Sequence, residues 1–198
     1  MALLLYNVFF HELLLVAEYQ PGLPVMQPSQ AMKTMRPYNC GVAAEAFAAG
    51  LFAHAGCNVA VQYGANQPEY DLVVTRQGCA IHVSVKGSQD GGWGLIQNHK
   101  KGRGYHEAAE AWAASQPRVI VYCLVQFQGV ALGECPRAYL ATVQEIAAWH
   151  KSSRNGLGGT ILWENYCYTR GVAKGCIQTI PAEWRFTKER LAHFLPVA

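Results

Sequence analysis

The chain has 198 residues, of which 51% are hydrophobic and 15% are charged. This length and composition are typical of one globular domain with a sizeable core, and they exclude an extensively disordered chain. The formal net charge of +3 is too small to identify a nucleic-acid-binding protein by itself. Any electrostatic argument must therefore rest on local clusters of charge.

Residues 1–31 combine an apolar segment with a proline-containing linker. The segment has no Lys or Arg before its apolar run, and His11-Glu12 interrupts that run, so it fits neither a secretory signal nor a spanning helix. Two interpretations stay open: an extra packing or partner helix, or upstream sequence before a true start at Met32 or Met35. We expect a cytoplasmic protein in which residues 32–198 form a single domain.

Seven cysteines, an odd number, occur without any Cys-x-x-Cys pair. Several lie within apolar runs, where a reduced cysteine packs as a small hydrophobic residue. We therefore expect free thiols in a reducing compartment, and no zinc site of finger-like spacing.

The first predicted element of the domain is a helix over residues 39–55, with Asn39 as its cap and Gly56 as its stop. Three β-forming runs follow, at residues 58–63, 70–76 and 79–86. Gln77-Gly78 reads as a tight turn between the second and third runs. These three runs predict antiparallel strands at the start of an α/β core.

The second half continues the alternation of helices and strands. A loop over 87–104 is followed by a helix at 105–115, a strand at 118–127, a strand at 138–142, a helix that ends near residue 150, a strand at 160–168 and a helix at 187–195. Thr142 and Glu145 have the spacing of a capping box, which marks the start of the helix between them and residue 150.

The candidate chemistry lies at the end of the hairpin. Period-two alternation places Ser84 and Lys86 on one face of the third strand and Val85 on the other. The Gln77-Gly78 turn brings Asp71 and Lys86 to the same open end of the two strands. An ion pair at a sheet edge is the alternative interpretation of these two residues.

Glu45 is a lone carboxylate on an otherwise apolar helix. Such a group is exposed, paired or functional, because an isolated buried charge is costly. The functional interpretation gains weight because Asp71 and Lys86 follow Glu45 in this order.

In this order, these residues resemble the PD-(D/E)XK, or restriction-endonuclease-like, superfamily, in particular its Holliday-junction-resolvase-like and small uncharacterised members. The matching segments are Gly41-Val-Ala-Ala-Glu45, Tyr70-Asp71-Leu-Val-Val74 and His82-Val-Ser-Val-Lys86-Gly-Ser-Gln89. The resemblance implies an α/β fold in which helices flank a central mixed sheet of four to five strands. It also implies a metal-dependent endonuclease that hydrolyses phosphodiester bonds of DNA.

The resemblance further implies a role for each residue. Asp71 and Glu45 would ligate Mg²⁺, or Mn²⁺ as a substitute, together with the backbone carbonyl of Val85. Lys86 would position the attacking water or help to deprotonate it, and Gln89 would make a secondary contact to the substrate. Enzymes of this superfamily often pair to cut two strands, so the resemblance allows a homodimer.

Ser84 departs from the family pattern, which usually has Glu, Asp or Gln at this position. A neutral hydroxyl is a weaker Mg²⁺ ligand than a carboxylate, so the predicted site has one negative charge fewer. Three outcomes stay open: a weakened nuclease, a nuclease in which Glu69 or His82 supplies the ligand, or a nuclease fold that acts only as a nucleic-acid-binding or protein-interaction module.

Lys100, Lys101 and Arg103 form the best local basic cluster, beside the aromatic Trp93 and Tyr105. Such a loop suits contact with a nucleic-acid backbone, and an ordinary solvated surface is the alternative.

Two other chemistries find little support. Cys40 lies near a helix start, where a thiolate would be favoured, but no partner motif for it is recognisable. The glycines from 87 to 94 lack the spacing of a nucleotide-binding loop.

Overall fold

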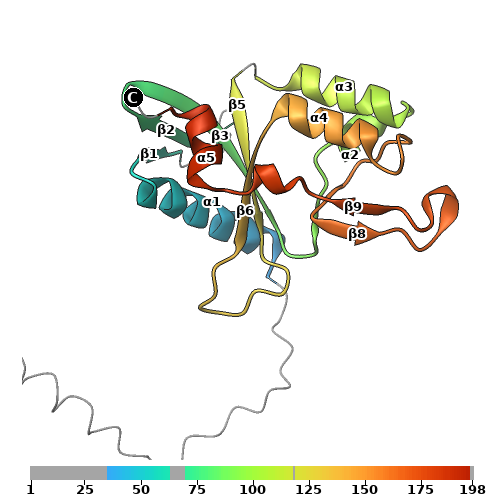
Figure 1. Cartoon of the computed structure of the whole chain (residues 1–198), viewed down its shortest axis with the longest axis horizontal. Helices are drawn as coiled ribbons and strands as arrows, with labels where there is room; N and C mark the ends of the chain where they lie inside the picture. Colours follow the sequence, from blue (N-terminus) through green and yellow to red (C-terminus); the bar gives the residue numbers. More distant parts are fainter. Residues whose placement is uncertain (1–34, 63–69, 118, 197–198) are drawn as a thin grey trace, which may run out of the picture. The chain divides into compact units, whose positions relative to one another are not determined.

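The computed structural model describes residues 35–62, 70–117 and 119–196, in which helices and strands alternate (Figure 1). The helices are α1 (Pro37–His54), α2 (Gln97–Lys100), α3 (Tyr105–Ser115), α4 (Val143–Ser152) and α5 (Lys188–Phe194), with short 3-10 helices η1 (Gly171–Ala173) and η2 (Ala182–Trp184). The strands are β1 (Asn58–Val61), β2 (Leu72–Arg76), β3 (Cys79–Ser88), β4 (Gly92–Trp93), β5 (Ile120–Gln126), β6 (Arg137–Thr142), β7 (Leu162–Trp163), β8 (Asn165–Cys167) and β9 (Ile177–Thr179).

A mixed five-stranded sheet forms the centre of the fold, in the order β1-β2-β3-β5-β6. The β3–β5 pair is parallel and the other neighbours are antiparallel. Gln77 and Gly78, at φ 47° and 82°, make the turn between β2 and β3. Two consecutive left-handed residues are what a two-residue hairpin turn requires, so the local sequence accounts for this hairpin. The predicted α/β class with a mixed sheet packed against helices is confirmed.

Helices cover both faces of this sheet (Figure 1). α1 and α5 pack on the face that buries Val83 and Cys123, and α3 and α4 pack on the face that buries Tyr122 and Leu124. Successive β5 residues alternate between the two clusters, as they do in a strand that is buried on both sides. Burial of each large apolar side chain contributes roughly 2 kcal/mol, so these two clusters supply most of the stabilisation.

Three predicted elements differ from the structure. The loop predicted over 87–104 contains the end of β3, the short strand β4 and the short helix α2. α1 begins at Pro37 rather than after a cap at Asn39, because proline suits the first helical position, where its missing N–H removes no hydrogen bond. The single strand predicted over 160–168 is divided at Glu164 into β7 and β8, which pair with β4 and β9 in two small sheets. The Glu164 side chain bonds to Arg137, and its place between the two sheets was not visible in the alternation.

The prediction of free thiols is confirmed, since all seven cysteines lie in the described part of the chain and none forms a disulfide. Among the described residues, no helix has both the length and the apolar character needed to cross a membrane. The expectations for residues 1–31, for a start at Met32 and for a ligand at Glu69 lie outside the described residues.

Candidate functional site

The candidate site begins where β2 and β3 separate. Their register ends at the pair Leu72 and Val83, and the backbone N–H of Asp71 donates to the Val83 carbonyl at 2.8 Å. The side chain of Asp71 then turns to β3, where its Oδ2 accepts the backbone N–H of Val85 at 2.6 Å. This charge-assisted hydrogen bond fixes the Asp71 carboxylate at the open end of the hairpin.

The backbone of Val85 faces the same gap. In an antiparallel pair, the N–H and C=O of one residue point to the same side of the strand, and the direction alternates along it. Val83 bonds to β2, so the N–H and C=O of Val85 also point toward β2, beyond its last paired residue. The Val85 carbonyl, which the sequence assigned to a metal, therefore points to the Asp71 side of β3.

α1 packs closely on β3 at this level. A Cβ on Gly87 would lie 2.7 Å from the backbone oxygen of Cys40 and 2.9 Å from Ala44 Cβ, so only glycine allows this approach. Ala44 is completely buried and Glu45 is half-buried. The contact at Gly87 thus sets Glu45 beside the end of β3 that carries Lys86.

The charges of Asp71 and Lys86 act on the carboxylate of Glu45. Burial, and then the negative charge of Asp71, raise the pKa of Glu45 above its ordinary value, while the positive charge of Lys86 opposes them. Because screening weakens interactions between distant exposed charges, this influence indicates that the three groups belong to one cluster. Residues from α1, from the segment before β2 and from β3 are brought together, in the order in which the sequence predicted them.

Lys86 is half-buried, and none of the ion pairs between described residues includes it. The edge ion pair with Asp71, which was the alternative interpretation, is therefore not formed. The backbone of Lys86 is held, because the indole Nε1–H of Trp93 donates to its carbonyl at 2.9 Å. The backbone from which the Lys86 side chain extends is thus held in place. No carboxylate of the described chain is paired with its ammonium group.

Ser84 occupies the position of the missing acid. It is 2% exposed, and its hydroxyl lies 3.5 Å from Asp71 Oδ2, a long and weak hydrogen bond. The predicted substitute His82 is instead stacked on Tyr70, with ring centroids 4.1 Å apart and ring planes at 6°. This stacked position opposes the outcome in which His82 supplies the missing metal ligand.

The donor set is compatible with a hard cation. It contains two carboxylates, from Asp71 and Glu45, together with the Val85 carbonyl and the Ser84 hydroxyl. Among the described residues, no group of three or more His, Cys, Asp or Glu side chains is arranged to hold a metal ion. Mg²⁺ is commonly held by one or two carboxylates while it keeps several waters, so this all-oxygen set fits Mg²⁺ and does not fit zinc.

Three of the four outer predicted residues form hydrogen bonds within the protein. Gln89, predicted to touch the substrate, donates its amide to the backbone carbonyl of Met35 at 2.6 Å. In and after α2, Lys100 donates to the Arg103 carbonyl and Arg103 donates to the His99 carbonyl at 3.2 Å. Lys101 is exposed. The basic cluster is thus a compact turn rather than an extended loop.

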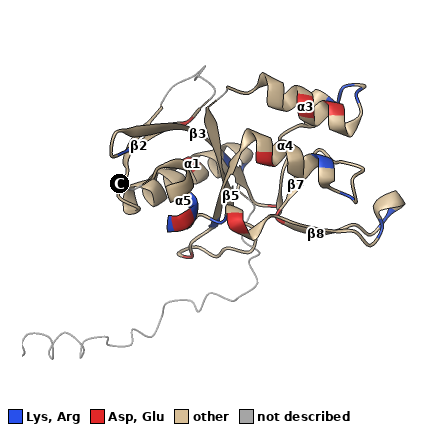
Figure 2. Cartoon of the chain, turned by 45° about the horizontal axis from the view of Figure 1, so that its top comes forward, with Lys and Arg blue, Asp and Glu red and all other residues tan. Residues whose placement is uncertain are grey.

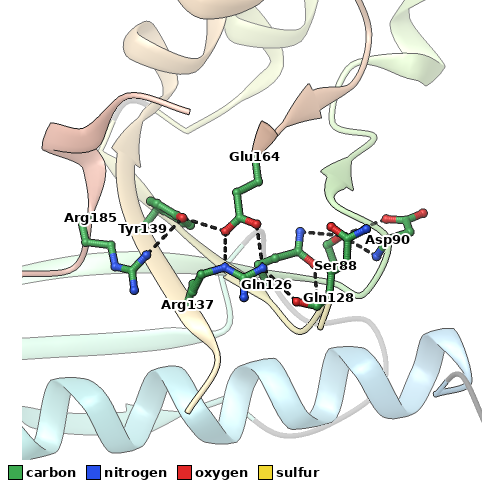
Figure 3. Close-up of polar contacts among 8 residues, drawn as sticks. All are labelled: Ser88, Asp90, Gln126, Gln128, Arg137, Tyr139, Glu164 and Arg185. Atoms are coloured by element: carbon green, nitrogen blue, oxygen red, sulfur yellow. Dashed lines mark hydrogen bonds and ion pairs between the residues drawn. The ribbon is translucent and has the colours of Figure 1, made fainter. Parts of the chain in front are cut away.

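A polar network beside the site was not predicted (Figure 3). Glu164 accepts two hydrogen bonds from Arg137 and one from the hydroxyl of Tyr139, each at 2.7 Å. Burial alone would raise the pKa of Glu164, but the hydrogen bonds from Arg137 and Tyr139 together bring it below its ordinary value. Glu164 is fully engaged as an anion, and it links β6 to the segment between β7 and β8.

The second half of this network lies at the ends of the parallel strands (Figure 3). Gln126 at the end of β5 donates to the Ser88 hydroxyl at 3.2 Å, and Ser88 donates to Asp90 at 2.9 Å. Gln126 is completely buried, so it is the polar exception that could have been noticed in the apolar run of β5. These bonds hold the turn that follows β3, directly after Lys86.

The alternative of thiol chemistry at Cys40 is opposed by its surroundings. Cys40 is 5% exposed and lies against Gly87. Burial, and then the negative charge of Asp90, raise the pKa of its thiol. A raised pKa disfavours the thiolate that a nucleophile needs.

Comparison of the chain with models of known protein families, with curated proteins and with solved structures finds no match.

Proposed function

We propose that this protein is a metal-dependent endonuclease that hydrolyses DNA phosphodiester bonds, with the restriction-endonuclease-like arrangement of Glu45, Asp71 and Lys86. The observation that carries the proposal is the Asp71 carboxylate, which is held at the open end of the β2–β3 hairpin by the N–H of Val85 at 2.6 Å, on the strand that also carries Lys86. Two carboxylates beside a lysine that has no acidic partner in the described chain are what phosphodiester hydrolysis requires from a protein.

Each residue has a defined part in this proposal. Asp71, Glu45 and the Val85 carbonyl would hold Mg²⁺, which when bound polarises a phosphoryl oxygen and lowers the pKa of water. Asp71 is kept in place by the Val85 N–H. Lys86 holds the attacking water toward the phosphorus and offsets the charge that develops on the phosphate.

The second candidate is a binding module with the same fold. The observation that favours it is Ser84, whose hydroxyl stands where a third acidic ligand is usual and lowers the negative charge of the site. Such a protein would bind nucleic acid or a protein partner and would not cleave phosphodiester bonds.

A cleavage assay separates the two candidates. The full chain is incubated with single-stranded, duplex and branched DNA, in Mg²⁺, in Mn²⁺ and in EDTA. We expect metal-dependent cleavage by the wild type and a loss of at least a hundredfold in Asp71→Ala and Lys86→Ala, since each substitution removes a group that acts on the reacting phosphate.

Lys188→Ala is the matched control, because Lys188 is exposed on α5 and lies outside the site. Equal cleavage by the wild type and both site variants would contradict the mechanism. DNA binding by a wild type that cuts none of the substrates would favour the binding module.

A further inference from the structure

A continuous row of aromatic rings and cations extends away from the candidate site. Its members, in order, are Trp163, Tyr166, Tyr168, Arg154, Tyr105 and Lys100. They come from β7, from β8 and the residue after it, from the loop that follows α4, and from the start of α3 and the end of α2. We call this set the aromatic–cation row.

The rings at one end of the row contact one another directly. Trp163 and Tyr166 are stacked, with centroids 4.3 Å apart and planes at 13°, and Tyr168 meets Tyr166 edge to face at 4.8 Å. The indole of Trp163 also lies against Gly92, where a Cβ would be 2.7 Å from the ring. Because each of these rings already contacts a neighbouring ring, the rings support one another and the Arg154 guanidinium.

The cations at the other end are held by ring faces. The Arg154 guanidinium lies 5.4 Å from the ring centroid of Tyr105 and 5.6 Å from that of Tyr168, and Lys100 Nζ lies 4.9 Å from Tyr105. Such contacts orient a cation without neutralising its charge. The positive groups are thus pre-arranged and still available to an anion.

Arg154 has hydrogen-bond capacity to spare. Its Nε is buried and has no hydrogen-bond partner among the described residues, and its Nη1 makes one long contact to the Gly158 carbonyl at 3.5 Å. Elsewhere in the described chain, Arg137, Lys151 and Arg190 are each paired with a carboxylate. The cations of the row form none of these ion pairs, so their charge is not offset within the described protein.

Exposed cations continue the row on both sides. Lys101 and Arg103 follow α2, and Arg170 and Lys174 lie in the connection between β8 and β9. The whole segment 165–182 contains no Asp or Glu. Figure 2 shows Lys and Arg at the tip of the β8–β9 connection and at the loop before α3, on the same side of the fold.

The row also reaches the candidate site. β4 pairs with β7, so Gly92 lies opposite Trp163. The next residue, Trp93, donates its indole N–H to the Lys86 carbonyl. The Lys86 carbonyl is therefore linked through Trp93 and the β4–β7 pair to Trp163, where the row begins.

We propose that the aromatic–cation row, together with the exposed cations beside it (Lys101, Arg103, Arg170 and Lys174), binds the phosphodiester backbone of a nucleic-acid strand and leads the strand toward the candidate site. The choice of nucleic acid as the polyanion rests on the proposed function, but binding to the row requires no metal and no cleavage. Rings that support cations give contacts to phosphate rather than to bases. Binding is accordingly salt-dependent and nearly independent of base sequence.

The test measures binding of the full chain in EDTA to three fluorescein-labelled probes: single-stranded DNA, single-stranded RNA and duplex DNA. Fluorescence anisotropy gives Kd at several salt concentrations. We expect the double variant Arg170→Gln/Lys174→Gln to bind at least about fivefold more weakly and to reduce the slope of log K against log salt by about 1.4 to 1.8, as the loss of two phosphate contacts requires. The strand type with the largest change identifies the natural ligand.

The matched control is Arg76→Gln/Lys188→Gln, which removes the same charge near the β2 and α5 end of the fold, away from the connection between β8 and β9 (Figure 1). Equal weakening in both double variants, or no binding of any probe by the wild type at low salt, would overturn the proposal. Asp71→Ala separates this inference from the proposed function: if this variant binds in EDTA as the wild type does, the row acts independently of catalysis, and a wild type that binds but does not cut contradicts only the nuclease.

Discussion

The hydroxyl of Ser84 lies 3.5 Å from Asp71 Oδ2 and is almost completely buried. A carboxylate at this place would face Asp71 at close range with little water between them. Like charges in such a position destabilise the metal-free protein and favour a bound cation. In the proposed site, the serine thus removes a like-charge repulsion at the cost of affinity for a cation.

Replacement of Ser84 by Asp is expected to reverse this balance. In EDTA the variant should unfold at a lower temperature than the wild type, and Mg²⁺ should raise its Tm by more, with an apparent Kd at least about tenfold lower, because an added ligand charge tightens cation binding. Ser84→Asn is the control, since it has nearly the same shape without the charge. Equal Mg²⁺ effects in the two variants would show that Ser84 does not face a metal.

The chain order of Glu45, Asp71 and Lys86 could be interpreted before the structure was known, because strand alternation and one tight turn place two of them. The partners of other side chains could not be predicted from the sequence. Gln89 bonds to the Met35 carbonyl, which is 54 positions away and has no local signal.

The contact between α1 and β3 depends on a residue without a side chain. A Cβ on Gly87 would meet the Cys40 oxygen at 2.7 Å, and this backbone atom cannot move independently of the helix. The close approach of the helix to the strand at this position therefore requires glycine, and the position of Glu45 depends on that approach.

Gly87→Ala is expected to destabilise the protein by about 1–3 kcal/mol through overpacking. It should also reduce the Mg²⁺-induced rise in Tm, because α1 and Glu45 are displaced from Asp71. Gly50→Ala, in the same helix but exposed and without neighbours within 4 Å, should instead stabilise by about 0.5–1 kcal/mol. Urea unfolding of the wild type, Gly87→Ala and Gly50→Ala measures the two changes in stability. Equal stabilities of the wild type and Gly87→Ala would contradict the close approach.

His150 connects the stability of the fold to pH. It is completely buried on α4, and its Nδ1 lies 3.1 Å from the Gly159 carbonyl, which can only accept, so Nδ1 carries the proton. Burial lowers the pKa of His150 to about 4, from an ordinary value of 6.5. The unfolded chain therefore binds a proton between these values that the folded protein does not.

The contribution of His150 to stability is fully present above pH 6.5 and is lost as the pH falls toward 4. Between pH 7.5 and 4.5 the wild type should lose up to about 3 kcal/mol more than His150→Gln, a variant that does not titrate there. Chemical unfolding at several pH values gives these free energies. His193→Gln, at an exposed histidine of α5, is the control, and a pH dependence of His150→Gln identical to that of the wild type would contradict this assignment.

The local sequence by itself determined the helices and main strands, the Gln77-Gly78 turn, and the end of the hairpin to which Asp71 and Lys86 belong, because these depend on neighbours a few positions apart. Only the tertiary structure decided how Glu45 meets that end, how Arg137 pairs with Glu164, and how the aromatic–cation row is assembled from four separate segments. These features depend on packing between residues distant in the chain, and such packing leaves no periodic pattern in the sequence. The sequence shows that a serine replaces the usual acid at position 84. Only the folded sheet shows that this serine is buried against Asp71.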